Sequence, residues 1–201
     1  MSQADADKWD QRYREGAYAS RTNPGVFLEQ WLPRLRVSAE RPRAVDLGCG
    51  AGRNALHLAR HGWEVDAVDI SQVALEQLAA KAREENLEIR CIQADLEAAG
   101  ALAHALSTPE RYDLALIIRY TQISLIEQIS SALRPGGYLL VELHLQTEEE
   151  VVGPRNPRFR VAPGAVRKAT DGLSIVACNE GLVEDVDGQM AALSQLVARR
   201  E

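Results

Sequence analysis

The stretch AVDLGCGAGRN, from Ala44 to Asn54, decides the fold of this chain. Its first residues form a short apolar run around Asp46, which is typical of a buried parallel strand. Glycines follow at alternate positions and lead into ALHLARH, whose apolar residues have helical spacing. A strand that turns through glycines into a helix brings bare backbone and a positive helix end close to a ligand. The stretch therefore predicts a nucleotide-binding turn.

A second strand and its terminal acid narrow the choice of ligand. This strand is expected at Glu64 to Asp69, and Asp69 lies about 20 residues beyond the first glycine, where an acid can accept both ribose hydroxyls of an adenosine. The glycines are spaced G-x-G-x-G, whereas a dinucleotide fingerprint would place its third glycine at position 53, which is Arg53. The spacing argues against a nicotinamide dinucleotide.

DLGCGAGRN followed by AVDIS resembles the first two motifs of the class I S-adenosylmethionine-dependent methyltransferases. In that family the glycine turn packs against the methionine part of the cofactor, and an acid after the third strand binds the adenine amino group. Asp95 matches that acid, although it could instead cap a helix. The resemblance implies S-adenosylmethionine as the cofactor, with S-adenosylhomocysteine as the product. The cofactor-binding residues expected on this basis are Asp46, Gly48, Cys49, Gly50, Arg53, Asn54, Asp69, Ile70, Asp95, Leu96 and Arg119.

Strands and helices alternate along the chain, which predicts a doubly wound, Rossmann-like α/β fold with helices on both faces. We expect a mostly parallel seven-stranded sheet with the order 3-2-1-4-5-7-6 and a C-terminal antiparallel hairpin that turns at Asp187-Gly188, as in the resembled family. The expected strands are 44–47, 64–69, 88–93, 112–118 and 134–145, and the expected helices include 26–35, 54–61, 99–106 (stopped near Pro109) and 122–133. Ser71 has the character of a helix N-cap.

Composition and length predict one domain over residues 1–201. The chain is 46% hydrophobic, enough for a substantial core. We divide it into an N-terminal helical cap or lid (1–40), a cofactor-binding core (44–145), a basic loop with a short helix (146–170) and the hairpin (171–201). Trp9 and Tyr13 share one helical face, which either packs on the domain or forms a lid that presents Arg12 or Tyr13 to the substrate.

Charge and apolar patterning exclude several kinds of partner. The net charge of −6 gives no broad nucleic-acid footprint. No apolar run has the length of a membrane span, and the N-terminus has no signal-like core, so we expect a cytoplasmic protein with no membrane partner. The three cysteines and four histidines lack metal-ligand spacing, so no metal is expected. Nothing in the sequence indicates an oligomeric state.

Ligands of such sheets bind outside the carboxyl ends of the strands, which places Gly48, Asp69, Asp95, Arg119 and His144 along one rim. No catalytic residue follows from the sequence alone, and the candidates are three. Arg119 is expected to contact the substrate or the cofactor carboxylate. His144 is either a general base for a hard nucleophile or a structural hydrogen-bonding residue. Tyr13 would act from the lid.

The segment from Val151 to Thr170 carries five basic residues and no acid. One interpretation is a solvated loop paired with the acidic run 148–150. The other is a flap that recognises an anionic acceptor, for which Arg155 and Arg158 are the candidates, together with Arg12 from the lid.

The short N-terminal helix, the cofactor motifs and GPRNPRF resemble small bacterial methyltransferases of the tellurite-resistance and thiopurine type. That resemblance implies methyl transfer by in-line displacement to a small molecule, with soft anionic sulfur, selenium or tellurium compounds as candidate acceptors. The strand ending IIRY lacks the Asn/Asp-Pro-Pro-Tyr/Phe sequence of amine methyltransferases and the Pro-Cys of cytosine C5 methyltransferases. A nicotinamide-dependent oxidoreductase and a non-catalytic S-adenosylmethionine-binding module remain the alternative functions.

Overall fold

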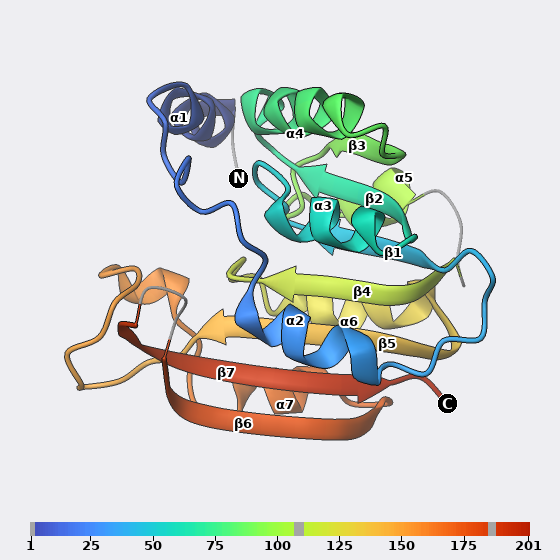
Figure 1. Ribbon diagram of the computed structural model, residues 1–201. Coiled ribbons are helices and arrows are strands. Elements are labelled where there is room, and N and C mark those ends of the chain that lie inside the picture. Colours follow the sequence, from blue (N-terminus) through green and yellow to red (C-terminus); the bar gives the residue numbers. More distant parts are fainter. Residues whose placement is uncertain (1–2, 107–110, 185–187) are drawn as a thin grey trace.

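The structure, a computed structural model, describes residues 3–106, 111–184 and 188–201. A seven-stranded sheet with the order β3-β2-β1-β4-β5-β7-β6 runs through it (Figure 1). The first five strands are parallel, and β6 and β7 are antiparallel additions beside β5. The strands are β1 (Arg43–Leu47), β2 (Glu64–Asp69), β3 (Ile89–Gln93), β4 (Tyr112–Ile118), β5 (Leu133–His144), β6 (Ser174–Glu184) and β7 (Met190–Arg199). The predicted fold class and strand order are confirmed.

Helices cover both faces of this sheet (Figure 1). One face packs against α2 (Val26–Trp31), α3 (Arg53–Arg60) and α4 (Gln72–Glu84), and the other against α5 (Ala101–Leu106), α6 (Ser124–Ile129) and α7 (Ala165–Ala169). All seven residues of β4 are buried, because this strand lies in the middle of the sheet between the two cores. Within the described ranges, no helix has both the length and the apolar character that crossing a bilayer requires.

Three predicted helices are shorter than expected, and the one expected over 99–106 begins only at Ala101. The helix expected over 26–35 ends at Trp31 and tightens into a 3₁₀ turn, Leu32–Arg34, because Pro33 brings no backbone N–H to an α-helical bond. The helix expected over 122–133 is α6 followed by a 3₁₀ turn, Ser130–Ala132. Pro109 and Asp187, the expected stop and turn residues, lie outside the described residues.

The N-terminal helix α1 (Gln3–Arg14) lies beside the amino end of α4 (Figure 1). One Asp10 carboxylate oxygen accepts a hydrogen bond from the Ser71 hydroxyl at 2.7 Å and one from the Val73 N–H at 3.2 Å. Gln77 donates to the Tyr13 carbonyl at 3.2 Å. These contacts attach α1 to the domain at the carboxyl end of β2.

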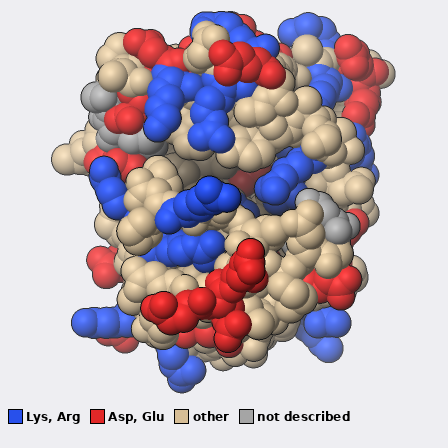
Figure 2. Space-filling view, turned by 90° about the vertical axis from the view of Figure 1, so that its left-hand side faces the viewer, with Lys and Arg blue, Asp and Glu red and all other residues tan. Residues whose placement is uncertain are grey.

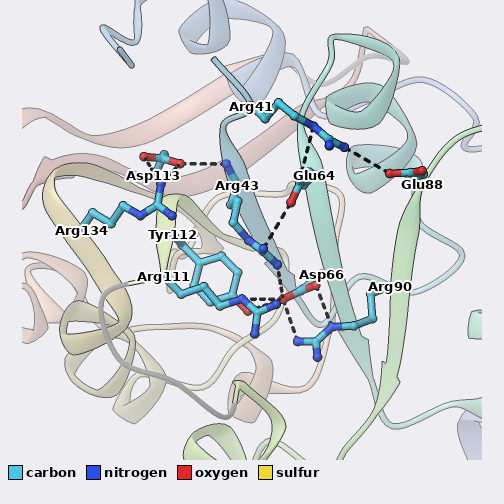
Figure 3. Close-up of polar contacts among 10 residues, drawn as sticks. All are labelled: Arg41, Arg43, Glu64, Asp66, Glu88, Arg90, Arg111, Tyr112, Asp113 and Arg134. Atoms are coloured by element: carbon cyan, nitrogen blue, oxygen red, sulfur yellow. Dashed lines mark hydrogen bonds and ion pairs between the residues drawn. The ribbon is translucent and has the colours of Figure 1, made fainter. Parts of the chain in front are cut away.

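The amino ends of the strands are joined by a network of ion pairs around Asp66 (Figure 3). Arg90 donates two hydrogen bonds to the Asp66 carboxylate, at 2.8 and 2.9 Å, and the Tyr112 hydroxyl donates a third. Arg43 and Arg111 lie 3.9 and 3.8 Å from the same group. The network links β1 to β4 at the edge of the sheet opposite to the expected ligand rim, so we assign it a structural role.

Candidate functional site

The turn after β1 is tied to the end of β2 by hydrogen bonds. The Gly48 N–H donates to the Val68 carbonyl at 2.8 Å. The Gly50 N–H donates to one Asp69 carboxylate oxygen at 2.8 Å, while the other oxygen accepts from the Ser71 N–H at 2.9 Å. Ser71 also caps α4 as predicted, through the Ala74 N–H. Asp69 therefore organises both the glycine turn and the start of α4.

Two glycines of this turn leave no room for a side chain. Gly48 and Gly50 have φ angles of +72° and +54°, which L-residues rarely adopt. A Cβ on Gly48 would lie 2.5 Å from Cγ of Tyr120, and a Cβ on Gly50 would collide with the Tyr13 hydroxyl. Tyr13 from α1 and Tyr120 from the end of β4 thus line the turn, although the two residues are far apart in sequence.

Two buried polar atoms beside the turn have no hydrogen-bond partner, namely Oδ2 of Asp46 and the hydroxyl of Tyr120. Asp46 is only 1% exposed, and burial raises the pKa of its carboxyl to about 7. The positive charge of the nearby Arg53 lowers this pKa but does not outweigh burial. A buried carboxylate is stabilised by a cationic or donor group. The ammonium and sulfonium groups of S-adenosylmethionine have this chemistry, and Asp69 has the acceptor chemistry for its ribose. The residues present therefore fit this cofactor.

Arg53 and Asn54, both predicted cofactor residues, hold the segment before α2. Arg53 donates to the Asn23 carbonyl at 3.5 Å, and the Asn54 side-chain oxygen accepts from the Gly25 N–H at 2.9 Å. Cys49 is inside the turn, where burial raises the pKa of its thiol well above the ordinary value. It is therefore an unreactive thiol at neutral pH.

Three further predicted cofactor residues, Ile70, Asp95 and Leu96, lie at the ends of β2 and β3. The Ile70 carbonyl accepts from the Gln93 side chain at 3.1 Å. Asp95 accepts from the Glu97 N–H at 3.0 Å within a turn, and it does not cap a helix, because α5 begins only at Ala101. Leu96 is buried in the core. The adenine contact of Asp95 stays a prediction.

Arg119 and His144, two of the catalytic candidates, are in contact. Arg119 has a φ of +61°, and its Nε donates to Oε1 of Glu142 at 2.7 Å. Its NH1 lies 3.3 Å from Nε2 of His144. The other Glu142 oxygen accepts from the Gln195 side chain at 2.8 Å. Sequence reasoning did not single out Glu142, although an acid within the apolar run YLLVELHL is a visible signal.

Tyr13 and Arg12 occupy different surroundings on α1. Burial, helped by the charge of Asp69, raises the pKa of Tyr13, so its hydroxyl stays protonated and can act as a donor but not as a base. Arg12 is exposed, and its guanidinium stacks on Trp9 at 4.9 Å and donates to the Tyr18 hydroxyl at 3.2 Å. Asp10, the residue that attaches the helix, was not predicted.

The basic loop continues from the same edge of the sheet as Arg119. Its Arg155 and Arg158 are exposed, in and beside the 3₁₀ turn Pro157–Phe159. Figure 2 looks onto the carboxyl ends of β4 and β5 and shows basic side chains around a central hollow. Among the described residues, no three His, Cys, Asp or Glu side chains form a group that could hold a metal ion.

A family profile and several known proteins relate this chain to methyltransferases. A family profile described as a methyltransferase domain matches residues 44–137. A ribosomal RNA small subunit methyltransferase C of Alcanivorax borkumensis is 34% identical over 48% of this chain and 30% of the relative. A probable S-adenosyl-L-methionine-dependent methyltransferase, TehB of Haemophilus influenzae, is 28% identical over 71% of this chain and 49% of the relative.

A solved structure repeats the fold of nearly the whole chain. TehB from Haemophilus influenzae superposes with a TM-score of 0.68 at 22% identity, covering 96% of this chain and 67% of that one. The chain spans only 30% to 40% of the length of the first curated relatives that it matches. Residues 44–137 thus match a methyltransferase domain, and the chain is similar to TehB in sequence and in fold.

Proposed function

We propose that this protein transfers a methyl group from S-adenosylmethionine to a small-molecule acceptor by in-line displacement. The observation that carries the proposal is the glycine turn with its surroundings: Asp69 at the end of β2, and the buried Asp46 and Tyr120 atoms that lack a partner. A phosphate-binding turn would offer N–H groups to an anion, whereas these side chains offer a carboxylate to a cation. That difference favours a sulfonium cofactor over a nicotinamide dinucleotide.

The acceptor is proposed to be anionic, with soft sulfur, selenium and tellurium compounds as the candidates. Basic side chains surround the hollow at the carboxyl ends of β4 and β5 (Figure 2). Arg119, whose side chain is 15% exposed, supplies a positive charge at the end of β4. The exposed Arg155 and Arg158 would attract the acceptor from solution, and exposed charges are screened by salt over about 8–10 Å.

When bound, S-adenosylmethionine supplies an activated methyl group on its sulfonium sulfur. Arg119 orients an anionic acceptor, and Glu142 and His144 hold its guanidinium in place. Because a guanidinium only donates hydrogen bonds, Nε2 of His144 accepts, and the proton of the neutral ring lies on Nδ1. In this arrangement Nε2 is engaged by a cation and is a poor general base. A soft anion needs no base, so the site suits that acceptor class.

Tyr13 and Tyr120 are proposed to close the site against water. Both side chains line the glycine turn, and burial raises the pKa of both hydroxyls. Protonated, uncharged rings exclude water without placing a second negative charge beside an anionic acceptor. In this proposal α1 is a lid, and residues 1–201 act as a single domain in the cytoplasm, without a nucleic-acid or membrane partner.

The test is transfer of labelled methyl groups to a panel of acceptors. Sodium selenite, sodium tellurite and thiophenol represent soft anions, benzoate and catechol represent oxygen acceptors, and a ribosomal RNA fragment represents nucleic acid. We expect label in the selenite, tellurite or thiophenol reactions only. Label in RNA would overturn the small-molecule assignment. Binding of S-adenosylhomocysteine with no transfer to any member would favour the non-catalytic module.

Arg155 and Arg158 are tested with the acceptor that accepts label in this panel. Either Arg155→Ala or Arg158→Ala should raise the acceptor KM at low salt and leave cofactor affinity unchanged. The difference from wild type should shrink at high salt because exposed charges are screened. Identical kinetics at both salt concentrations would mean that the loop is only a solvated surface.

A further inference from the structure

The segment 152–161 folds back onto the end of β5 instead of extending into solvent. The Val152 N–H donates to the Met190 carbonyl at 2.9 Å. At the other end, the Val161 N–H donates to the His144 carbonyl at 2.8 Å, and Leu145 and Val161 form a parallel bridge. Both ends of the segment are therefore attached to the sheet, next to His144.

Arg160 fixes the segment from within. Its Nε donates to the Pro154 carbonyl at 2.9 Å, and its NH1 donates to the Leu145 carbonyl at 2.8 Å. Arg160 thus joins the start of the segment to the residue directly after β5. Among the three arginines 155, 158 and 160 it is the half-buried one, whereas the other two are exposed.

Gly153 lies against the His144 ring. Its φ is +121°, and a Cβ built on it would lie 2.6 Å from Cε1 and 2.7 Å from Nδ1 of His144. Real Cβ atoms do not approach ring atoms so closely, so a side chain here would displace the imidazole or the segment. His144 as a whole is 9% exposed, and its ring has Gly153 on one side and the Arg119 guanidinium at Nε2.

We propose that Gly153 and Arg160 are positioning residues for Arg119. Arg160 holds the segment, Gly153 sets the place of the His144 ring, and His144 with Glu142 sets the place of the guanidinium. The inference rests on the proposed function, because it assigns to Arg119 the acceptor contact. It gives the basic segment a second role, distinct from the attraction of an anion by Arg155 and Arg158.

The first experiment is Gly153→Ala, with Gly164→Ala as the matched control. Gly164 also has a left-handed φ, +76°, but a Cβ there would meet nothing within 4 Å. The control therefore places an alanine at a positive φ without the collision. With selenite or thiophenol as the acceptor, we expect Gly153→Ala to raise the acceptor KM about tenfold or more, since a misplacement of about 1 Å can cost about 10²-fold. Affinity for S-adenosylhomocysteine should stay within about twofold of wild type, and Gly164→Ala should resemble wild type.

A double-mutant cycle distinguishes positioning from general damage. If Gly153→Ala acts through the imidazole, it should change KM by less than about twofold in the His144→Ala background, where the ring is gone. An equal effect in both backgrounds would overturn the proposal. So would equal effects of Gly153→Ala and Gly164→Ala.

A spectroscopic measurement keeps the test independent of turnover. In long-range ¹H–¹⁵N spectra, the His144 ring should be the Nδ1-protonated tautomer in wild type, and its signals should move in Gly153→Ala and not in Gly164→Ala. If Gly153→Ala fails to fold, Arg160→Lys is the substitute variant, because one lysine cannot bond the Pro154 and Leu145 carbonyls together. Its matched control is Arg167→Lys, at an exposed position of α7. Unmoved His144 signals in the folded variant refute the positioning, whereas moved signals without any methyl transfer refute only the proposed function.

Discussion

Replacing Asp69 with asparagine should weaken cofactor binding much more than it weakens the fold. The Asp69 carboxylate accepts hydrogen bonds from Gly50 and Ser71 at 2.8 and 2.9 Å. Burial nevertheless raises its pKa above the ordinary value, because desolvation outweighs these backbone hydrogen bonds. The charge itself therefore costs the cofactor-free protein free energy, and an amide would remove that cost while losing one of the two acceptors.

In the free energy of unfolding, the relieved desolvation of Asp69 partly cancels the lost hydrogen bond. In the free energy of cofactor binding, nothing compensates for the lost contact to the ribose. We expect the free energy of unfolding without cofactor to change by less than about 1.5 kcal/mol, since one lost hydrogen bond costs about that much or less after the desolvation cost is relieved. In the complex, the ribose hydroxyls of the cofactor lose a charged hydrogen-bond acceptor. That loss should weaken binding by about 1.5–3 kcal/mol, or about 10- to 150-fold in affinity.

Calorimetric titration of S-adenosylhomocysteine and urea unfolding at pH 7.5 measure these two quantities. Asp113→Asn is the matched control. Asp113 accepts from the Arg43 N–H at 2.8 Å and from Arg134 at 3.1 Å, at the opposite edge of the sheet (Figure 3). It should lose stability and keep cofactor affinity. An Asp69→Asn variant that binds S-adenosylhomocysteine as tightly as wild type would refute the ribose assignment.

Three further predictions concern pH and the lid. Burial raises the pKa of Asp46 to about 7, so the cofactor-free protein should lose stability, measured by urea unfolding, as the pH rises from about 4 to about 7. Calorimetry should show cationic S-adenosylmethionine binding more tightly at pH 8 than at pH 6, because Asp46 is then ionised. Asp46→Asn should remove both pH dependences. Burial acts to raise the pKa of Asp66, but the hydrogen bonds from Arg90 and Tyr112 outweigh burial and lower the pKa. The ionised Asp66 carboxylate therefore stabilises the fold above about pH 4, and this stabilisation is lost as the pH falls through the lowered pKa. Asp66→Asn should lower the free energy of unfolding by about 2–3 kcal/mol at pH 7. Breaking a fully buried ion pair costs about 3–5 kcal/mol, and the loss here is smaller because the Arg90 side chain is 44% exposed. A loss of the same size at pH 2 would contradict this explanation. Asp10→Ala should increase hydrogen exchange in residues 3–14 and slow turnover with the sheet intact, whereas unchanged exchange would mean that Asp10 does not hold α1.

The sheet could be predicted because its strands carry strong local signals. The bounds of β2 and β4 agree with the expected ones. β4 is an almost unbroken apolar run, and β2 lies between Gly62 and the helix cap Ser71. Ser71 was recognisable as a cap because its side chain acts within one turn of its own helix. By contrast, Pro33 shortened a helix whose apolar stripe alone predicted continuation to Leu35.

The contacts within the site depend on distances that no local pattern contains. Glu142 meets Gln195 because the two residues are paired in the register of β5 and β7, more than 50 positions apart in sequence. Tyr13 reaches Gly50 because Asp10 and Gln77 hold α1 beside α4. The sequence could place Arg119 and His144 at one edge of the sheet, but their mutual contact follows from side-chain conformations fixed by packing.

Calorimetric titration of S-adenosylhomocysteine into the wild-type protein, with and without a saturating concentration of NADH, tests the central claim most directly. The glycine turn with Asp46, Asp69 and Tyr120 should bind one molecule of S-adenosylhomocysteine, with the same affinity whether or not NADH is present. Absence of binding, or an affinity that falls when NADH is added, would contradict the assignment of this turn to S-adenosylmethionine.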